Sequence, residues 1–260
     1  NKIKVNIKYY CTYKKDNIGY NINLEQFTNP YFLPEDVNIA IIFAGLTNIS
    51  FCESNKEICK LINFTNTSNL IRFLNKRKIK CMFISSSSVF SNQAKKMSES
   101  DVMKPDTCYG LMKSKLEEII LTSDLNTVLR LTKVMGDDNR LIINWISRLK
   151  SNLTINAFKD LRVSPISINE VTKYLINWIY NPFNGLFHLT SDNDLSYFDL
   201  ILNISNHLKF NQNLIIPSSV YSSNELPLYR PVKANLDVTD IRSRIVSLED
   251  EIRTISKYYE

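Results

Sequence analysis

The stretch Ile79-Lys-Cys-Met-Phe-Ile-Ser-Ser-Ser-Ser-Val-Phe90 indicates the fold of this 260-residue chain. Its first six residues, Ile79–Ile84, are mainly apolar and predict a buried strand. Four serines follow directly, so hydroxyl groups gather where that strand ends. Because ligands bind at the carboxyl ends of the strands in parallel sheets, the stretch predicts part of a binding site as well as part of a sheet.

The segments on both sides alternate between strand and helix. Val37–Ala44 is rich in β-branched residues and ends at Gly45, which predicts a second buried strand. Apolar side chains recur with helical period over residues 54–77 and 107–122, and Asn126–Leu131 predicts a further strand. Such alternation with short connections is typical of an α/β fold whose parallel sheet is covered on both faces.

The pattern becomes less regular after residue 136. The sequence there predicts helices near 137–150, 169–180, 196–208 and 248–258, with a strand at 185–190 and a short extended stretch at 164–168. We expect residues 136–260 to form a smaller lobe that caps a first domain of residues 1–135.

Composition excludes several classes of protein. Hydrophobic residues make up 44% of the chain and charged residues 22%, which is globular composition and excludes intrinsic disorder. The net charge of +6 is mild and forms no basic stripe, so we expect no nucleic-acid partner. No apolar run approaches the roughly 20 residues that span a bilayer, so we expect no membrane partner and a cytoplasmic location.

The cysteines and histidines do not predict a metal site. The five cysteines are odd in number and lack Cys-x-x-Cys spacing, which also disfavours a disulfide framework. One of the two histidines, His188, lies in the apolar run Gly185–Thr190, where a strand histidine with satisfied hydrogen bonds is expected. We therefore expect no metal.

The candidate catalytic residues form a Tyr-x-x-x-Lys pair, Tyr109-Gly-Leu-Met-Lys113. The pattern alone is weak, because Tyr10…Lys14 and Tyr229…Lys233 share it. However, Tyr109 opens a predicted helix, so Lys113 lies one turn further on the same side. Phe43-Ala-Gly45, the serine run and this helix follow one another at successive strand ends. A glycine there lets a flat ligand lie against the backbone.

These features resemble the extended short-chain dehydrogenases/reductases of the NAD-dependent epimerase/dehydratase superfamily, which act on nucleotide sugars. The chain is most similar to the dTDP-4-dehydrorhamnose reductase branch, the RmlD-like sugar-nucleotide-binding proteins. The matching segments are Ile41–Asn48, Phe83–Phe90, Glu99–Asp101 with Pro105 and Tyr109-Gly110, Val128–Gly136, and Arg230–Asp237.

The resemblance implies a Rossmann-like doubly wound sheet with a smaller C-terminal substrate-binding lobe. It implies NAD(P)H-dependent reduction of a 4-keto nucleotide sugar, for surface-polysaccharide sugar biosynthesis, by an enzyme that can form a homodimer. Tyr109 would supply the proton, with its phenolate favoured by the Lys113 ammonium and the positive nicotinamide. Lys113 would also bind the nicotinamide ribose, and Ser86 would hydrogen-bond the sugar oxygen.

The same resemblance assigns the binding residues. Those expected at the cofactor are Phe43, Ala44, Gly45, Leu46, Ile84, Ser85, Tyr109, Lys113 and Thr132. Those expected at the substrate are Ser86, Ser87, Lys133 and Arg230.

The family's first strand and Gly-x-x-Gly-x-x-Gly turn have no counterpart, because the five glycines are isolated. Lys2–Tyr10 resembles the family's second strand, so we expect an N-terminally incomplete fragment. Lys14 and Lys15 follow that strand, where basic residues suit the 2′-phosphate of NADP. NADPH is therefore slightly favoured over NADH.

Two alternatives remain open. Ser91 stands where the branch usually has an acidic residue, and Lys133 where it usually has Trp. The serine run fits a nucleotide-sugar 4-epimerase that retains its NAD equally well, and a non-catalytic regulatory protein can keep this fold. Stoichiometric consumption of NAD(P)H distinguishes a reductase from an epimerase.

Overall fold

The computed structural model describes residues 12–13, 20–21, 24–25, 33–43, 45–90, 95–222 and 227–260. Several residues on which expectations rest, namely the strand Lys2–Tyr10, the basic pair Lys14 and Lys15, Ala44 and Ser91, lie outside the described residues.

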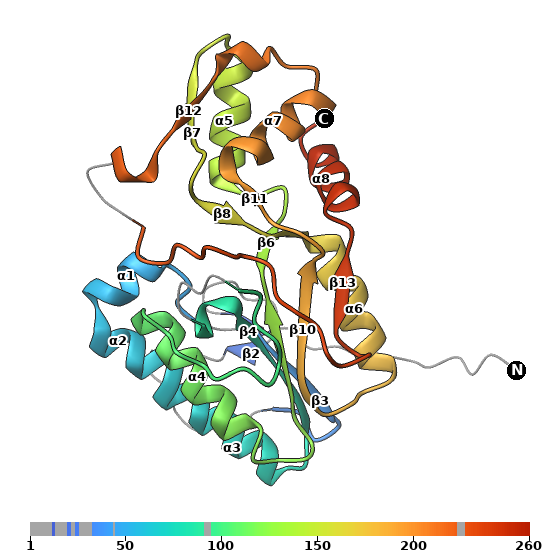
Figure 1. The fold of residues 1–260 in the computed structure, drawn as a ribbon. Coiled ribbons are helices and arrows are strands. Elements are labelled where there is room, and N and C mark those ends of the chain that lie inside the picture. The colour runs from blue at the N-terminus through green and yellow to red at the C-terminus, as the bar shows by residue number, and fades with distance from the viewer. Residues whose placement is uncertain are drawn as a thin grey trace, which may run out of the picture.

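A sheet of five parallel strands forms the centre of the protein (Figure 1). Its order is β13-β10-β5-β4-β3, and all four neighbouring pairs are parallel. The strands are β3 (Ile39–Ile42), β4 (Lys80–Ser86), β5 (Thr127–Leu131), β10 (Gly185–Ser191) and β13 (Arg244–Val246). The predicted parallel α/β sheet is thus confirmed.

Both faces of this sheet are covered, because side chains alternate across each strand. On β4, Cys81 and Phe83 join the core beneath the helices α3 (Thr67–Lys76) and α4 (Cys108–Ile120). Met82 joins the opposite core beneath α6 (Ile168–Tyr180), which includes the fully buried Trp178. The near-continuous apolar runs seen in the sequence follow from burial on both faces.

The single helix predicted over residues 54–77 is divided in the structure. It consists of α1 (Ile49–Ser54), α2 (Lys56–Lys60), a π-helical turn η1 (Leu61–Asn66) and α3. Buried polar side chains explain the change of pitch. Asn63 bonds to both backbone groups of Leu46, Asn66 donates to the carbonyl of Leu24, and the hydroxyl of Thr67 donates to the carbonyl of Ile62. The π turn therefore ties this segment to the loop after β3.

The smaller lobe is built from three short strand pairs and three helices. Its helices are α5 (Arg140–Lys150), α7 (Tyr197–His207) and α8 (Leu248–Lys257), close to the predicted ranges. The strand pairs, mostly not predicted, are β6 (Lys133–Met135) with β9 (Pro165–Ser167), β7 (Ile155–Phe158) with β12 (Ile215–Ser218), and β8 (Arg162–Val163) with β11 (Leu195–Ser196).

The remaining elements are short. They are the parallel pair β1 (Thr12–Tyr13) and β2 (Tyr20–Asn21), and the 3₁₀ turns η2 (Ser87–Val89), η3 (Gln212–Leu214) and η4 (Val220–Ser222). No helix in the described ranges is both long and apolar enough to cross a membrane.

The second half of the chain also contributes to the central sheet. After the lobe strands β6 to β9, the chain returns through α6 and β10, and it returns again through β13 (Figure 1). The division of the chain at residue 135 stays a prediction, and the sheet of the first domain needs two strands from beyond it.

The N-terminal turn of α4 lies against the end of β4. The side chain of Thr107 caps the helix by accepting from the amide of Gly110 at 3.1 Å. A Cβ atom at Gly110 would lie 2.1 Å from the carbonyl oxygen of Ser88, closer than any real contact. The missing side chain therefore sets how near α4 comes to the serine run.

We predict that Gly110→Ala destabilises the protein by about 1–3 kcal/mol, because the added methyl group meets backbone that cannot move aside. In an ordinary helix the same change would stabilise by up to about 1 kcal/mol. Urea unfolding measures the free energy. Gly136→Ala is the control, since its Cβ would meet side chains alone, at 3.3 Å from Asp138 and 3.6 Å from Ile168, and no backbone atom. A Gly110→Ala variant as stable as the wild type would contradict the close approach.

Candidate active site

The structure brings Ser86, Tyr109 and Lys113 together at the carboxyl end of β4. Ser86 ends the strand, and Tyr109 and Lys113 lie one turn apart on α4. The phenol of Tyr109 lies near enough to the Ser86 hydroxyl for that hydroxyl to lower its pKa. The ammonium of Lys113 donates to the carbonyl of Ile84 at 2.8 Å. This arrangement places a phenol and a hydroxyl side by side, with a buried cation one turn below them.

Tyr109 is held as a neutral phenol. The residue is 9% exposed, and burial raises its pKa to about 12, opposed only in part by the nearby Ser86 hydroxyl. The Lys113 ammonium lies 5.7 Å from the centre of the Tyr109 ring. In the protein alone, burial outweighs the expected effect of this cation. Tyr109 therefore carries its proton at neutral pH and can donate it.

Lys113 is a buried cation with few partners. It is 4% exposed, and burial lowers its pKa to about 8, while the carboxylate of Glu117 acts in the opposite direction. Its ammonium lies 4.3 Å from the centre of the Phe83 ring. An ammonium has three protons to donate, and Ile84 is the acceptor that the structure records.

The loop after β3 presents an open backbone surface. Phe43 is 57% exposed at the strand end, and Gly45 has φ +147, a conformation that favours glycine. A Cβ at Gly45 would lie 2.9 Å from the amide oxygen of Asn63, which accepts from the amide of Leu46. Asn63 thus fixes the loop, and an exposed ring beside a bare backbone fits a flat cofactor.

Two further residues expected at the cofactor are largely covered. The hydroxyl of Ser85 donates to the carboxylate of Glu117, so its side chain points away from the site. Thr132 is 8% exposed, and its hydroxyl accepts from Ser164 at 3.5 Å. Ile84 is half-buried, and its carbonyl accepts from Lys113. Ser85 can therefore meet a cofactor through its backbone only.

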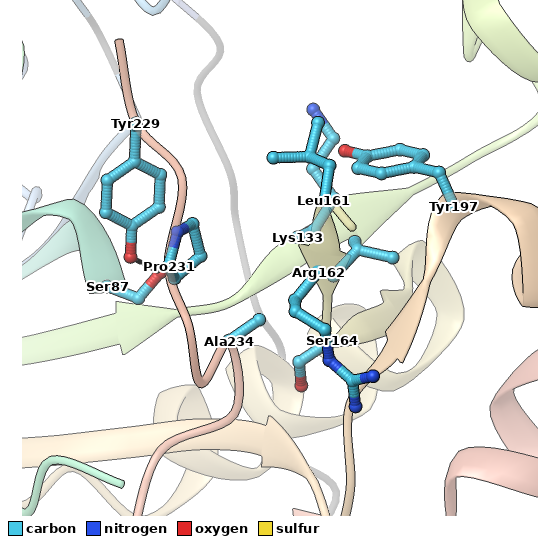
Figure 2. A pocket seen from close by; sticks show the side chains of 10 residues that line it. Ser87, Lys133, Leu161, Arg162, Ser164, Tyr197, Tyr229, Pro231 and Ala234 are labelled. Carbon is cyan, nitrogen blue, oxygen red and sulfur yellow. Dashed lines mark hydrogen bonds between the residues drawn. The ribbon is translucent and has the colours of Figure 1, made fainter. Parts of the chain in front are cut away.

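A cavity of about 90 Å³ opens beside the serine run, between the central sheet and the small lobe. Figure 2 shows Ser87, Tyr229, Pro231 and Ala234 on one side and Leu161, Arg162 and Tyr197 on the other. Lys133, Val163 and Ser164 complete the lining. The expected substrate residues Ser87 and Lys133 thus share one cavity, and Arg230 is not among the residues that line it.

Sequence reasoning missed three side chains of this cavity. The guanidinium of Arg162 is fixed by the buried carboxylate of Asp194. The hydroxyl of Tyr229 donates to that of Ser87 at 3.4 Å, and burial raises the pKa of Tyr229 to about 12. Tyr197 caps the opposite wall (Figure 2). Tyr229 shares the Tyr-x-x-x-Lys pattern, which is weak by itself, but it directly precedes the matched segment Arg230–Asp237.

His188 is the strand histidine that the sequence predicts. Its Nδ1 lies 2.8 Å from the carbonyl of Asp237, and its Nε2 lies 3.3 Å from the guanidinium of Arg130. Burial lowers its pKa to about 4, so the ring is neutral at neutral pH.

The sequence matches the RmlD substrate binding domain family over residues 14–256. The chain belongs to this family. The match covers most of the chain and confirms the resemblance expected from the serine run and the Tyr-x-x-x-Lys helix. The matched range also includes every residue that lines the cavity, from Ser87 to Ala234.

Relatives of this RmlD-family chain include curated and solved proteins. It is 27% identical over 234 residues to a probable low-salt glycan biosynthesis reductase of Haloferax volcanii, covering 85% of this chain and 77% of the relative. The structure superimposes on dTDP-4-dehydrorhamnose reductase from Bacillus anthracis, solved with NADP, with a TM-score of 0.77 and 18% identity over 84% of this chain and 79% of that one. The enzyme from Yersinia enterocolitica gives 0.74 and 22%, over 84% and 81%. These likenesses confirm the Rossmann-like fold.

We predict that Lys113→Met stabilises the protein at pH 7 by about 1–3 kcal/mol. Lys113 has a pKa of about 8 when folded and 10.5 as its ordinary value, so folding below pH 8 places a charge in a buried site. The free-energy cost of burying this charge falls as pH rises from 8 and is gone near 10.5. The extra stability of Lys113→Met over the wild type should therefore shrink between these two pH values. Urea unfolding at several pH values measures it.

The exposed neighbour Lys115 provides the control, and Lys115→Met should change stability little at any pH. A Lys113→Met variant less stable than the wild type at pH 7 would show that the ammonium is not desolvated as described.

Proposed function

We propose that the protein uses Ser86, Tyr109 and Lys113 to reduce the 4-keto group of a nucleotide sugar with NADPH or NADH. The observation that carries this proposal is the contact of a protonated, buried phenol with the Ser86 hydroxyl at a strand end. Membership of the RmlD family and the likeness to reductases of glycan and dTDP-sugar synthesis support reduction of a sugar nucleotide.

Ketone reduction needs a hydride donor, a proton donor and a group that holds the oxygen. Bound NAD(P)H would supply the hydride. Tyr109 supplies the proton, because burial keeps its phenol protonated until an alkoxide develops beside it. Ser86 donates a hydrogen bond to the same oxygen and orients the carbonyl toward Tyr109.

Lys113 supports this proton transfer by its charge and its free donors. Its ammonium lies 5.7 Å from the centre of the Tyr109 ring and favours the phenolate that forms after the proton leaves. The two protons not given to Ile84 can meet the ribose hydroxyls of the cofactor. Phe43, Gly45 and Leu46 form the adjoining surface for that cofactor.

The cavity beside Ser87 receives the sugar nucleotide. Hydroxyl groups of Ser87 and Tyr229 and the exposed ammonium of Lys133 line it, which suits a hydroxylated and charged ligand. Arg162 is held rigidly by Asp194 and can contact an anionic group without moving. The homodimer stays a prediction.

We predict that Tyr109→Phe lowers turnover by about 10²–10⁴-fold, because the alkoxide loses its proton donor while the side-chain volume is kept. The assay is steady-state oxidation of NAD(P)H with a 4-keto nucleotide sugar, and one cofactor should be oxidised for each sugar reduced. Ser86→Ala should cost less, since water can partly replace a neutral donor.

Tyr221→Phe is the matched control, since Tyr221 is 72% exposed and lies outside the cavity lining. Turnover in Tyr109→Phe within a few-fold of the wild type would remove Tyr109 from the chemistry. Conversion of the sugar without net NAD(P)H oxidation would identify an epimerase instead.

We further propose that NADPH is the preferred cofactor, with Lys14 and Lys15 at its 2′-phosphate. Replacing both lysines with Ala should then weaken NADPH much more than NADH in fluorescence titrations, because only NADPH carries that phosphate. Equal weakening of both cofactors would mean that the two lysines do not recognise it.

A further inference from the structure

A buried ionic network lies directly beneath the proposed catalytic residues. Glu117 is fully buried and Arg130 is 2% exposed, and two of their contacts measure 2.7 and 3.0 Å. The guanidinium continues to His188 at 3.3 Å and lies 4.8 Å from the centre of the Phe90 ring. Burying an ion pair so completely is costly, and its net contribution to stability is often small. The mechanism described above does not use it.

Glu117 is linked to Lys113 through both the helix α4 and the strand β4. The two residues are four apart on α4, so they lie on one face of the helix. On β4, Ile84 accepts from the Lys113 ammonium, and the next residue, Ser85, donates its hydroxyl to Glu117. One carboxylate is therefore bound to the strand end that accepts the hydrogen bond of Lys113, and it lies on the helix that bears Lys113.

The other charged groups around Lys113 are engaged elsewhere or neutral. Arg130 on β5 is bonded to Glu117 and His188. Glu53 on α1 pairs with Lys56. The thiols of Cys52 and Cys59, on α1 and α2, have raised pKa values through burial and are uncharged at neutral pH. Tyr109 is neutral as well.

We propose that Glu117 is a positioning residue for the reduction, whose carboxylate keeps the buried Lys113 an ammonium and holds it against the end of β4. Its effect on catalysis rests on the proposed function, whereas its effect on Lys113 does not. Without that negative charge, the opposite charge that raises the pKa of Lys113 would be gone, and of the network described above the Arg130 cation would remain. Loss of its proton at working pH would then remove both the charge near Tyr109 and the donors for a ribose.

The experiment follows the titration of Lys113 directly. The protein is prepared with ¹³C at lysine Cε, and the Lys113 signal is assigned by its loss in Lys113→Arg. The wild-type midpoint should lie near pH 8. In Glu117→Gln it should fall by about one unit or more, as expected when a close opposite charge is removed. Glu118→Gln, the next residue on the exposed side of α4, should leave it unchanged.

Glu117→Gln leaves Arg130 without its counter-ion, so it can fail to fold. If it does, the Lys113 midpoint is measured in the double variant Glu117→Gln/Arg130→Gln, from which both charges have been removed. A lowered Lys113 midpoint in the folded variant supports the proposal. A midpoint within a few tenths of a unit of the wild type overturns it, and so does loss of folding in both variants, since Glu117 would then be required for the fold itself.

Activity measurements distinguish failure of the Glu117 proposal from failure of the proposed reductase function. In the wild type and in the folded variant, the alkaline limb of the pH profile of NAD(P)H oxidation should move with the Lys113 midpoint. An inactive wild type would overturn the reductase proposal, while the titration would still decide the role of Glu117.

Discussion

The near contact between Gly110 of α4 and the carbonyl of Ser88 governs the geometry of the whole site. It brings the helix close enough for the Tyr109 phenol to reach Ser86 and for the Lys113 ammonium to reach the carbonyl of Ile84. A side chain at this position would separate the helix from the strand end, move the phenol away from Ser86 and lengthen the hydrogen bond of Lys113. The chemistry thus depends on packing that a hydrogen atom permits and a methyl group does not.

The main elements of the fold could be predicted because each carries a strong local pattern. The apolar runs of β4 and β5 are nearly continuous because both faces of these strands are covered by core residues, whereas β3 is mostly half-buried. Met112, Leu116 and Ile120 of α4 are buried against the rest of the protein. The division of the segment at 49–76 could not be predicted from period alone. It depends on where the amide side chains of Asn63 and Asn66 find partners, in loops distant in sequence. The short lobe strands β7 and β12 pair across about 60 residues, so neither shows a local signal.

The candidate site divides in the same way. Ser86, Tyr109 and Lys113 could be placed because they follow strand ends in order. Tyr229, Tyr197 and Arg162 could not, because they reach the cavity from separate elements, namely the loop before Arg230, the start of α7 and the strand β8. For Ser85 the position at a strand end could be predicted, but the direction of its side chain could not. Its hydroxyl donates to the buried carboxylate of Glu117, because a charged acceptor forms a stronger hydrogen bond than a neutral one.

The repeated return of the chain to the central sheet has a consequence for how the protein folds. β10 pairs with β5 across more than 50 residues, and β13 joins only after β10 and the small lobe have been made. Such non-local pairing lowers folding rates. During synthesis, β5 keeps an open edge until residue 191 has left the ribosome, and an open edge can pair with other chains. The order of strands in the sheet therefore sets a period in which the nascent chain is exposed to aggregation.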